Sequence, residues 1–202
     1  PETVVFADAR ADAERRDFTV NGLFFDPIAE QLHDWVGGEA DLRAKVIRTI
    51  GSPEERFAED HLRLLRAVRF AAQLDFEIEP ATFTALQANA AKIKLISAER
   101  VRDELLKLFS PAPIPVAADV RRRTNTRDLN PPPNVVGEME TVASRGLRLL
   151  HASGLLEHVL PEIAATVTCD QSPDFHPEGT VFNHLCLMLK QLSPDAHPSL
   201  PW

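Results

Sequence analysis

The feature that most constrains this chain is a run of four charged residues at every third position: Asp60, Arg63, Arg66 and Arg69. They lie within residues 59–72, a stretch without Gly or Pro that is rich in Leu, Ala and Arg. That composition predicts a helix interior. Because residues three apart are neighbours on a helix surface, we expect the four charges to form one ridge, with apolar residues beside it facing a core.

This ridge offers a carboxylate followed by guanidinium groups at one-turn intervals. Such groups supply an acceptor and planar, bidentate donors, which suit phosphates and the hydrogen-bonding edges of bases. The plainer interpretation is a solvated helix face on which Asp60 pairs with Arg63 or with a residue one turn away. Taken alone, the helix favours the plainer interpretation.

The composition limits the class of protein. The 202 residues suffice for one large or two small domains, and 44% hydrophobic with 26% charged residues is typical of a soluble globular protein. The net charge of −8 argues against a general nucleic-acid binder but leaves room for a local basic groove. Two cysteines without metal-type spacing favour a reducing cytoplasm, and no apolar stretch approaches the length of a membrane span.

The patterning predicts an α+β fold that becomes all-helical along the chain. The first zone, residues 1–51, is expected to mix short elements: a strand at 3–6, a helix at 12–23, two β-like runs at 22–26 and 31–36 joined by a hairpin turn, a helix at 40–44 and a strand at 45–50.

The second zone, residues 52–110, is expected to be helical. Ser52 followed by Pro53 and two Glu residues is an N-cap, a Pro at N1 and an acidic first turn. One helix is predicted to run from there to about residue 74, and others cover 80–91 and 97–109. Residues 111–136 contain three consecutive prolines and read as a linker or insertion.

The third zone, residues 137–202, is expected to form a helical body. Its predicted helices cover residues 138–152, 155–160 and 180–191.

A second constellation is the run Arg-Arg-Asp-Phe-Thr-Val-Asn at residues 15–21. On a helix, Arg16, Thr19 and Asn21 would project near one another while Phe18 points inward. Arg can bind a triphosphate, and Asp or Asn can read ribose hydroxyls or hold an Arg in place. Taken alone, a charged helix start that pairs with itself is the better interpretation. A third feature, Asp34 ahead of a double Gly, is interpreted as the cap of a tight turn.

Together these motifs resemble the class II tRNA nucleotidyltransferase and bacterial poly(A) polymerase family. The resemblance covers roughly residues 3–109 and rests on the order and spacing of several runs: Arg-Arg-Asp-Phe-Thr-Val-Asn-Gly-Leu at 15–23, Asp-Pro at 26–27, Asp-Trp-Val-Gly-Gly at 34–38 with Asp-Leu at 41–42, Ile-Arg-Thr-Ile-Gly at 47–51, and Arg-Phe-Ala-Glu-Asp-x-x-Arg at 56–63. Residues 97–105 are similar to the family's later neck helix, and 154–162 and 176–184 to the body segment that follows.

The resemblance implies template-independent addition of C and A nucleotides (CCA) to tRNA 3′ ends, or of A to RNA 3′ ends. CTP and ATP would be the substrates and Mg²⁺ the cofactor. The implied architecture is a head at 1–51, a helical neck at 52–110, the insertion at 111–136 and a helical body at 137–202. This sequence does not separate CCA addition from poly(A) addition.

The resemblance also implies roles for single residues in nucleotide binding. Arg16 would contact the phosphates or ribose, with Asp17 and Asn21 near the sugar. Asp60 and Arg63 would pair with the edge of the incoming CTP or ATP base and act as a protein template. The remaining members of the ridge would support that site or contact phosphates: Arg66 and Arg69.

One departure from the family's pattern concerns the chemistry itself. The family's metal-binding carboxylates and Gly-rich nucleotide loop lie upstream of the Arg-Arg-Asp-Phe-Thr run, and this chain begins too late to contain them. We therefore expect no catalytic residue in this chain and Mg²⁺ bound by residues outside it. Since phosphoryl transfer depends on metal-mediated charge neutralisation, the chain alone is predicted to be inactive.

The histidines near the C-terminus suggest an alternative. His176 and His184 could open a phosphohydrolase site of the His-Asp type, but no His-Asp dipeptide follows in this sequence. Two His residues eight apart are not on adjacent helical turns and make no metal site alone, so no metal ligand is predicted within the chain. A second alternative is a nucleotide- or RNA-binding module without chemistry.

Overall fold

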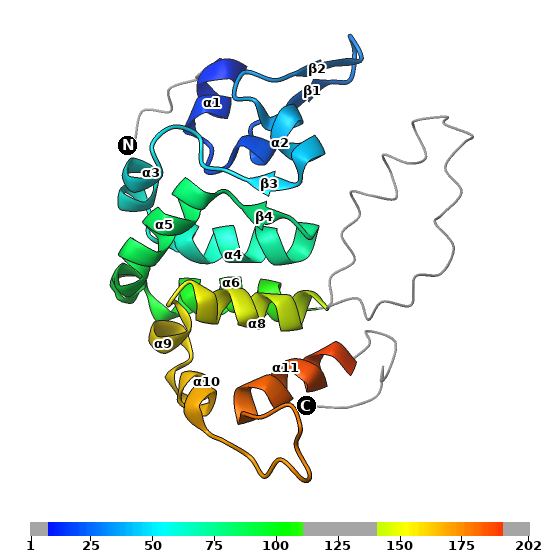
Figure 1. Ribbon diagram of the computed structural model, residues 1–202. Coiled ribbons are helices and arrows are strands. Elements are labelled where there is room, and N and C mark those ends of the chain that lie inside the picture. The colour runs from blue at the N-terminus through cyan, green and yellow to red at the C-terminus, as the bar shows by residue number, and fades with distance from the viewer. Residues whose placement is uncertain (1–7, 111–140, 192–202) are drawn as a thin grey trace, which may run out of the picture.

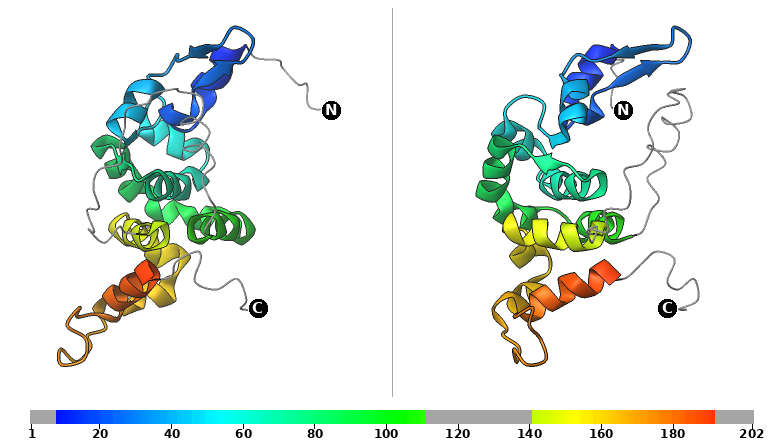
Figure 2. Two further views of the ribbon diagram at one scale, coloured as in Figure 1. Left: turned by 90° about the vertical axis from the view of Figure 1, so that its right-hand side faces the viewer. Right: turned by 45° about the vertical axis from the view of Figure 1, so that its right-hand side comes forward.

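The computed structural model describes residues 8–110 and 141–191. These residues form an elongated stack of short elements, in which the chain descends from a small α+β unit at one end to a helical unit at the other (Figure 1). The two further views keep this order of layers (Figure 2). The strand predicted at 3–6 and the Pro-rich segment at 111–136 lie outside the described residues.

The N-terminal helix α1 (Ala9–Arg15) is shorter than predicted. Its N-cap is Asp8, whose Oδ1 accepts from the Ala11 N–H at 2.7 Å, and it ends before Arg16, whose ψ of 164° is extended. The prediction of one helix over 12–23 is therefore wrong. The backbone instead forms a bridge between Phe18 and Thr49 before a short 3₁₀ turn, η1 (Thr19–Asn21). A pairing between residues 31 positions apart overrides the local helical pattern.

Two small sheets follow. Strands β1 (Phe24–Asp26) and β2 (Gln31–His33) pair antiparallel, and Asp26 Oδ1 accepts the Ile28 and Ala29 N–H groups in the predicted hairpin turn. Strand β2 stops short of the predicted residue 36. Strand β3 (Val46–Ile47), also shorter than predicted, pairs in parallel with β4 (Glu77–Ile78).

The turn before helix α2 (Gly38–Ala44) explains why β2 ends early. Asp34 Oδ1 accepts from the backbone N–H groups of Val36, Gly37 and Gly38, and Oδ2 accepts from Glu39 at 2.9 Å. One carboxylate thus satisfies four donors at a helix start, where N–H groups lack intrahelical partners. The interpretation of Asp34 as the cap of a tight turn is confirmed.

The predicted helix over 53–74 is two helices, α3 (Pro53–Glu59) and α4 (Leu62–Leu74). The chain leaves helical geometry at Asp60, with φ −151° and ψ 108°. Asp60 is the C-cap residue of α3, and its Oδ1 accepts from the Leu62 N–H at 3.0 Å, so this carboxylate satisfies the first backbone donor of α4 instead of continuing a helix. Asp favours helix ends over helix interiors, but a single Asp in a stretch otherwise rich in helix-forming residues was not enough to predict the break.

The remaining described elements are almost all helical, and most lie where the sequence predicted helices. Their bounds are α5 (Pro80–Asn89), η2 (Ala90–Leu95), α6 (Ala98–Phe109), α8 (Val142–Ala152), α9 (Leu156–Val159), α10 (Pro161–Ala164), η3 (Ala165–Thr168) and α11 (Val181–Gln191). The α+β fold class with a helical C-terminal part is confirmed. No helix in the described ranges is long and apolar enough to cross a membrane.

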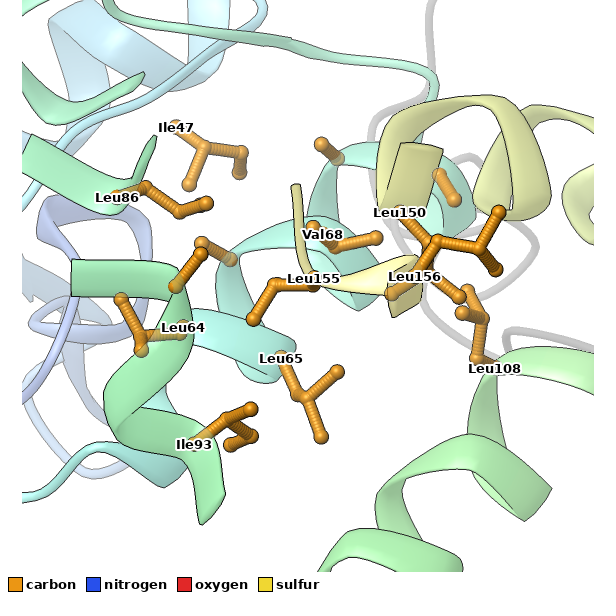
Figure 3. Packing of buried hydrophobic residues seen from close by; sticks show 14 of the residues in the cluster. Ile47, Leu64, Leu65, Val68, Leu86, Ile93, Leu108, Leu150, Leu155 and Leu156 are labelled. Carbon is orange, nitrogen blue, oxygen red and sulfur yellow. The ribbon is translucent and has the colours of Figure 1, made fainter. Parts of the chain in front are cut away.

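The hydrophobic core is continuous along the stack. Helix α4 packs against α6 and α8, and Figure 3 shows its Leu64, Leu65 and Val68 among side chains from distant segments. The cluster of buried hydrophobic residues that contains these side chains extends from Phe18, just before η1, to Cys186 on α11. The zone boundaries at 51, 110 and 136 remain predictions, but the described parts of these zones share one core.

Candidate nucleotide-recognition site

Asp17 is the buried acidic centre of the N-terminal part of the site. Its side chain is 7% exposed, and Oδ2 accepts from Arg66 Nε at 2.6 Å. Oδ1 accepts from Asn21 Nδ2 at 2.9 Å and from the Phe18 N–H at 3.0 Å. A buried carboxylate needs such partners, since an unpaired one would be costly. Asp17 therefore joins the Arg-Arg-Asp-Phe-Thr run to α4.

Arg16 lies apart from this pair. It is exposed, and its guanidinium pairs with Asp12 one turn back at 2.7 Å and lies 5.5 Å from the ring centroid of Phe24. The expectation that Arg16 and Asn21 project together from one helix is wrong, because α1 ends at Arg15 and Asn21 belongs to η1. Asn21 instead contacts Asp17.

The two C-terminal arginines of the ridge are held by buried partners. Arg69 Nε donates to Glu104 Oε2 on α6 at 2.7 Å, and its guanidinium lies 4.1 Å from the Phe70 ring centroid. Arg66 lies 5.2 Å from the same centroid while it pairs with Asp17. Glu104 is 3% exposed. These two arginines thus connect α4 to the N-terminal unit and to α6.

Arg63 faces α3. Its Nη1 donates to the backbone oxygen of Arg56 at 2.9 Å and pairs with Glu59. Arg56 in turn donates to the Ile50 and Glu14 backbone oxygens, at 2.6 Å each, and to Glu59. Arg63 is therefore positioned by a network that spans α1, α3 and α4.

Asp60 pairs across the fold with Arg100 rather than with Arg63. Arg100 Nη2, on α6, donates to Asp60 Oδ2 at 2.7 Å. Burial acts to raise the pKa of Asp60, but hydrogen bonds from Arg100 and the Leu62 N–H, with the charges of Arg100 and Arg63, hold this pKa below its ordinary value. The carboxylate is thus a charged acceptor at neutral pH.

The α3–α4 turn places Asp60 and Arg63 next to each other, because the Arg63 N–H donates to the Asp60 carbonyl oxygen at 3.1 Å. One is a charged acceptor and the other a planar donor, and both remain partly exposed. Such a pair can match the donors and acceptors on one edge of a base. Arg66 and Arg69 are instead engaged in ion pairs, with Asp17 and Glu104, that hold α4 in place.

Three partners of the site were missed by sequence reasoning: Glu59, Arg100 and Glu104. Glu59 had a local signal, since it lies four residues before Arg63. Arg100 and Glu104 lie 40 and 35 residues from their partners. No periodicity pairs residues so far apart, so only the packing of α6 against α4 could reveal them.

The described residues offer no carboxylate cluster beside Asp17 or Asp60. Among them, a single group of three potential metal ligands was found, and it lies near α11. The described part of this site therefore does not fit a Mg²⁺ centre, which needs several oxygen ligands.

Comparison with protein families places the motifs in context. Residues 1–48 match the model of the poly A polymerase head domain, and residues 75–113 match the model described as the probable RNA and SrmB-binding site of polymerase A. The chain is 45% identical over 110 residues to the CCA-adding enzyme of Staphylococcus aureus strain MRSA252, covering 54% of this chain and 27% of that enzyme.

Solved structures of CCA-adding enzymes are similar to this chain as well. A crystal structure of the Bacillus stearothermophilus CCA-adding enzyme in complex with CTP is 33% identical, with a TM-score of 0.57, and the match covers 74% of this chain and 30% of that one. The Thermotoga maritima CCA-adding enzyme complexed with tRNA shares the fold at 23% identity and a TM-score of 0.55, over 84% of this chain and 34% of that one.

Fold and motifs therefore define the class as that of the nucleotidyltransferase head and its helical neck. In these matched segments the chain is similar to the CCA-adding enzymes and to bacterial poly(A) polymerases. It spans about a quarter of the length (27%) of the curated relatives that it matches.

Proposed function

We propose that this chain supplies the base-recognition part of an RNA nucleotidyltransferase that adds C and A nucleotides to tRNA 3′ ends. The observation that carries the proposal is that the α3–α4 turn holds an acceptor, Asp60, and a donor, Arg63, close together: the Arg63 N–H donates to the Asp60 carbonyl oxygen, and the charge of Arg63 helps to lower the pKa of the Asp60 carboxyl group. The similarity to CCA-adding enzymes favours CCA addition over poly(A) addition. The partners are then CTP, ATP and the tRNA 3′ end.

The site residues divide by role in this proposal. Asp60 and Arg63 read the base edge, and Arg16, exposed beside the N-terminal unit, contacts the phosphates or ribose. The ion pair of Asp17 with Arg66 holds α4 against the N-terminal unit. The roles proposed for Asp17 and Arg16 follow from exposure, since Asp17 is almost fully buried while Arg16 is exposed.

Mg²⁺ belongs to the proposal as the ion that neutralises charge on the transferred phosphate. The described residues do not provide its ligands, so other residues of the complete enzyme would hold it. We further propose that the chain alone does not catalyse nucleotide transfer. Incubated with Mg²⁺, CTP, ATP and tRNA that lacks its CCA end, it should extend no tRNA under conditions in which the Staphylococcus aureus relative does.

The decisive experiment is calorimetric titration of CTP, ATP, GTP and UTP into the chain and into its Asp60→Ala and Arg63→Ala variants. We expect CTP and ATP to be preferred, and the preference to fall by about tenfold in either variant, since a bidentate base contact is worth about 1–3 kcal/mol. Arg102→Ala is the matched control, because Arg102 is exposed and pairs only with its neighbour Asp103 among the described residues. Equal binding of all four nucleotides, or unchanged preference in both variants, would refute base recognition by this pair.

A further inference from the structure

Three aromatic side chains gather at the β1–β2 hairpin and form what we call the aromatic cluster: Phe24, His33 and Trp35. Phe24 and His33 are directly opposite in the strand register, so their side chains lie on the same face of the two-stranded sheet. The His33 and Trp35 rings are parallel, with 4° between their planes and 5.2 Å between their centroids. The Phe24 ring lies 6.0 Å from that of Trp35, tilted by 55°.

The aromatic cluster stands outside the hydrophobic core. The buried cluster that runs from Phe18 to Cys186 includes neither Phe24 nor Trp35, and neither is among the partly buried residues packed against it. All three side chains of the aromatic cluster are half-buried. The hairpin that carries them projects from the N-terminal end of the molecule (Figure 1). The core therefore does not account for this grouping of large rings.

The other face of the hairpin differs in chemistry. It carries the opposed pair Phe25 and Leu32, which are 55% and 44% exposed. Within the described hairpin, the parallel ring pair occurs only on the face of Phe24. The two faces therefore provide a comparison within one small sheet.

The aromatic cluster adjoins the candidate nucleotide-recognition site through Arg16. The Arg16 guanidinium lies 5.5 Å from the Phe24 ring centroid, and the next residue, Asp17, pairs with Arg66 on α4 at 2.6 Å. In α1, the backbone oxygen of Glu14 accepts from the side chain whose own backbone oxygen positions Arg63. Arg16, which the proposed function assigns to the nucleotide phosphates or ribose, thus lies between the aromatic cluster and the base-recognition pair.

The chemistry of the aromatic cluster suits unpaired bases. Proteins bind single-stranded RNA by stacking its bases on Trp, Phe and His rings, whereas the bases of a duplex are already stacked on their neighbours. We propose that Phe24, His33 and Trp35 stack bases of a single-stranded RNA, as the strand whose 3′ end the reaction extends. The inference rests on the proposed function and adds a contact for the RNA that is separate from the contact for the incoming nucleotide.

The charges around the aromatic cluster predict that stacking dominates this binding. The three rings carry no permanent charge. Two flanking carboxylates, Asp26 and Asp34, accept hydrogen bonds from the backbone N–H groups of their own turns, so they are held in place by the hairpin and by the start of α2. Because few phosphates are neutralised here, the affinity for RNA should depend only weakly on salt.

The test uses the fluorescence of Trp35, since a base stacked on the indole quenches its emission. The chain has two tryptophans, and Trp202→Phe leaves Trp35 as the only one. A single-stranded RNA of about six nucleotides should quench this emission, whereas a blunt double-stranded RNA should not. An increase in salt from about 50 to about 200 mM should weaken the binding by less than about tenfold, as one or two phosphate contacts predict.

Variants separate the aromatic cluster from the rest of the fold. His33→Ala and Trp35→Ala should each weaken binding of a labelled RNA of the same length, measured by fluorescence anisotropy, by about fivefold or more, because a base loses an aromatic stacking partner. Trp35→Phe keeps a ring and should retain most of the affinity, which distinguishes lost stacking from lost folding. Phe25→Ala, on the opposite face of the hairpin, is the matched control and should bind as the unsubstituted chain does.

The outcomes also distinguish this inference from the proposed function. Asp60→Ala should lose the preference among nucleotides and still bind the RNA. The inference is overturned by any of three results: no binding of single-stranded RNA, equal binding by the chain and by His33→Ala and Trp35→Ala, or quenching of Trp35 by duplex RNA or by CTP and ATP as strong as that by the single strand. Base recognition by Asp60 and Arg63 would survive each of these results, because its own readout is the nucleotide titration.

Discussion

The Arg100 guanidinium donates to the Asp60 carboxylate across 2.7 Å and thereby ties α6 to the turn between α3 and α4. Asp60 Oδ1 also accepts from the N–H of Leu62, the first residue of α4. Oδ1 thus fixes the start of α4, while Oδ2 accepts a hydrogen bond from a residue 40 positions later in the chain. The position of the Asp60 carboxylate, one half of the proposed base-recognition pair, is consequently set by α6 as well as by α4.

Substitution of Arg100 should separate recognition from stability. Arg100→Gln removes a pair that is 51% and 32% exposed, so the free energy of unfolding should fall by less than about 1 kcal/mol. Preference for CTP and ATP should nevertheless drop, because Asp60 loses the partner that orients it. Urea unfolding and nucleotide titration measure the two effects. Arg102→Gln, on the same helix, should change neither.

Loss of the Asp17 carboxylate should be far more costly. Asp17→Ala leaves Arg66, Asn21 and the Phe18 N–H without their acceptor, and we expect destabilisation by about 2–4 kcal/mol. A double-mutant cycle with Arg66→Ala checks the cause, since the two effects should be clearly less than additive. Additive effects would show that the ion pair contributes little.

Glu104 should make stability depend on acidic pH. Burial is the largest influence and acts to raise its pKa, but hydrogen bonds from Lys107 and Arg69 outweigh it and leave the pKa below its ordinary value. A carboxyl group with a lowered folded-state pKa stabilises the fold above its unfolded pKa of about 4.3, and this contribution disappears as pH falls through the lower folded-state value. Urea unfolding from pH 7 to pH 3 should therefore show a smaller loss for Glu104→Gln than for the unsubstituted chain.

The close approach of α6 and α8 should make Gly146 intolerant of a larger residue. A Cβ at this position would lie 2.7 Å from Leu108 Cδ1, and Leu108 is 2% exposed. We expect Gly146→Ala to destabilise the fold by about 1–2 kcal/mol, because overpacking outweighs the gain of about 1 kcal/mol in helix propensity. In a Leu108→Ala background the same substitution should be neutral or stabilising. Thermal unfolding distinguishes these outcomes.

Local patterns predicted most helices of the described chain but misplaced the two boundaries that matter for the site. Ser52 and Pro53 marked the start of α3 correctly. Asp60 looked like a helix-surface residue, yet it interrupts the helix, and Arg16 lies just beyond the end of α1. Helical periodicity describes which face a residue takes once a helix exists. It does not show that a segment leaves the helix to pair with a distant part of the chain, as Phe18 does with Thr49.

The sequence by itself indicated the resemblance to these enzymes, the α+β character and the candidate residues, because motif order, spacing and apolar periodicity are properties of the linear chain. Tertiary structure decided the partners: Asp17 with Arg66, Asp60 with Arg100, and Arg69 with Glu104. It also brought His176, Glu178 and His184 together through a single turn at Gly179. These contacts depend on how the helices pack and on where the backbone reverses direction. Both are set by burial of the shared hydrophobic core, which joins residues far apart in the sequence.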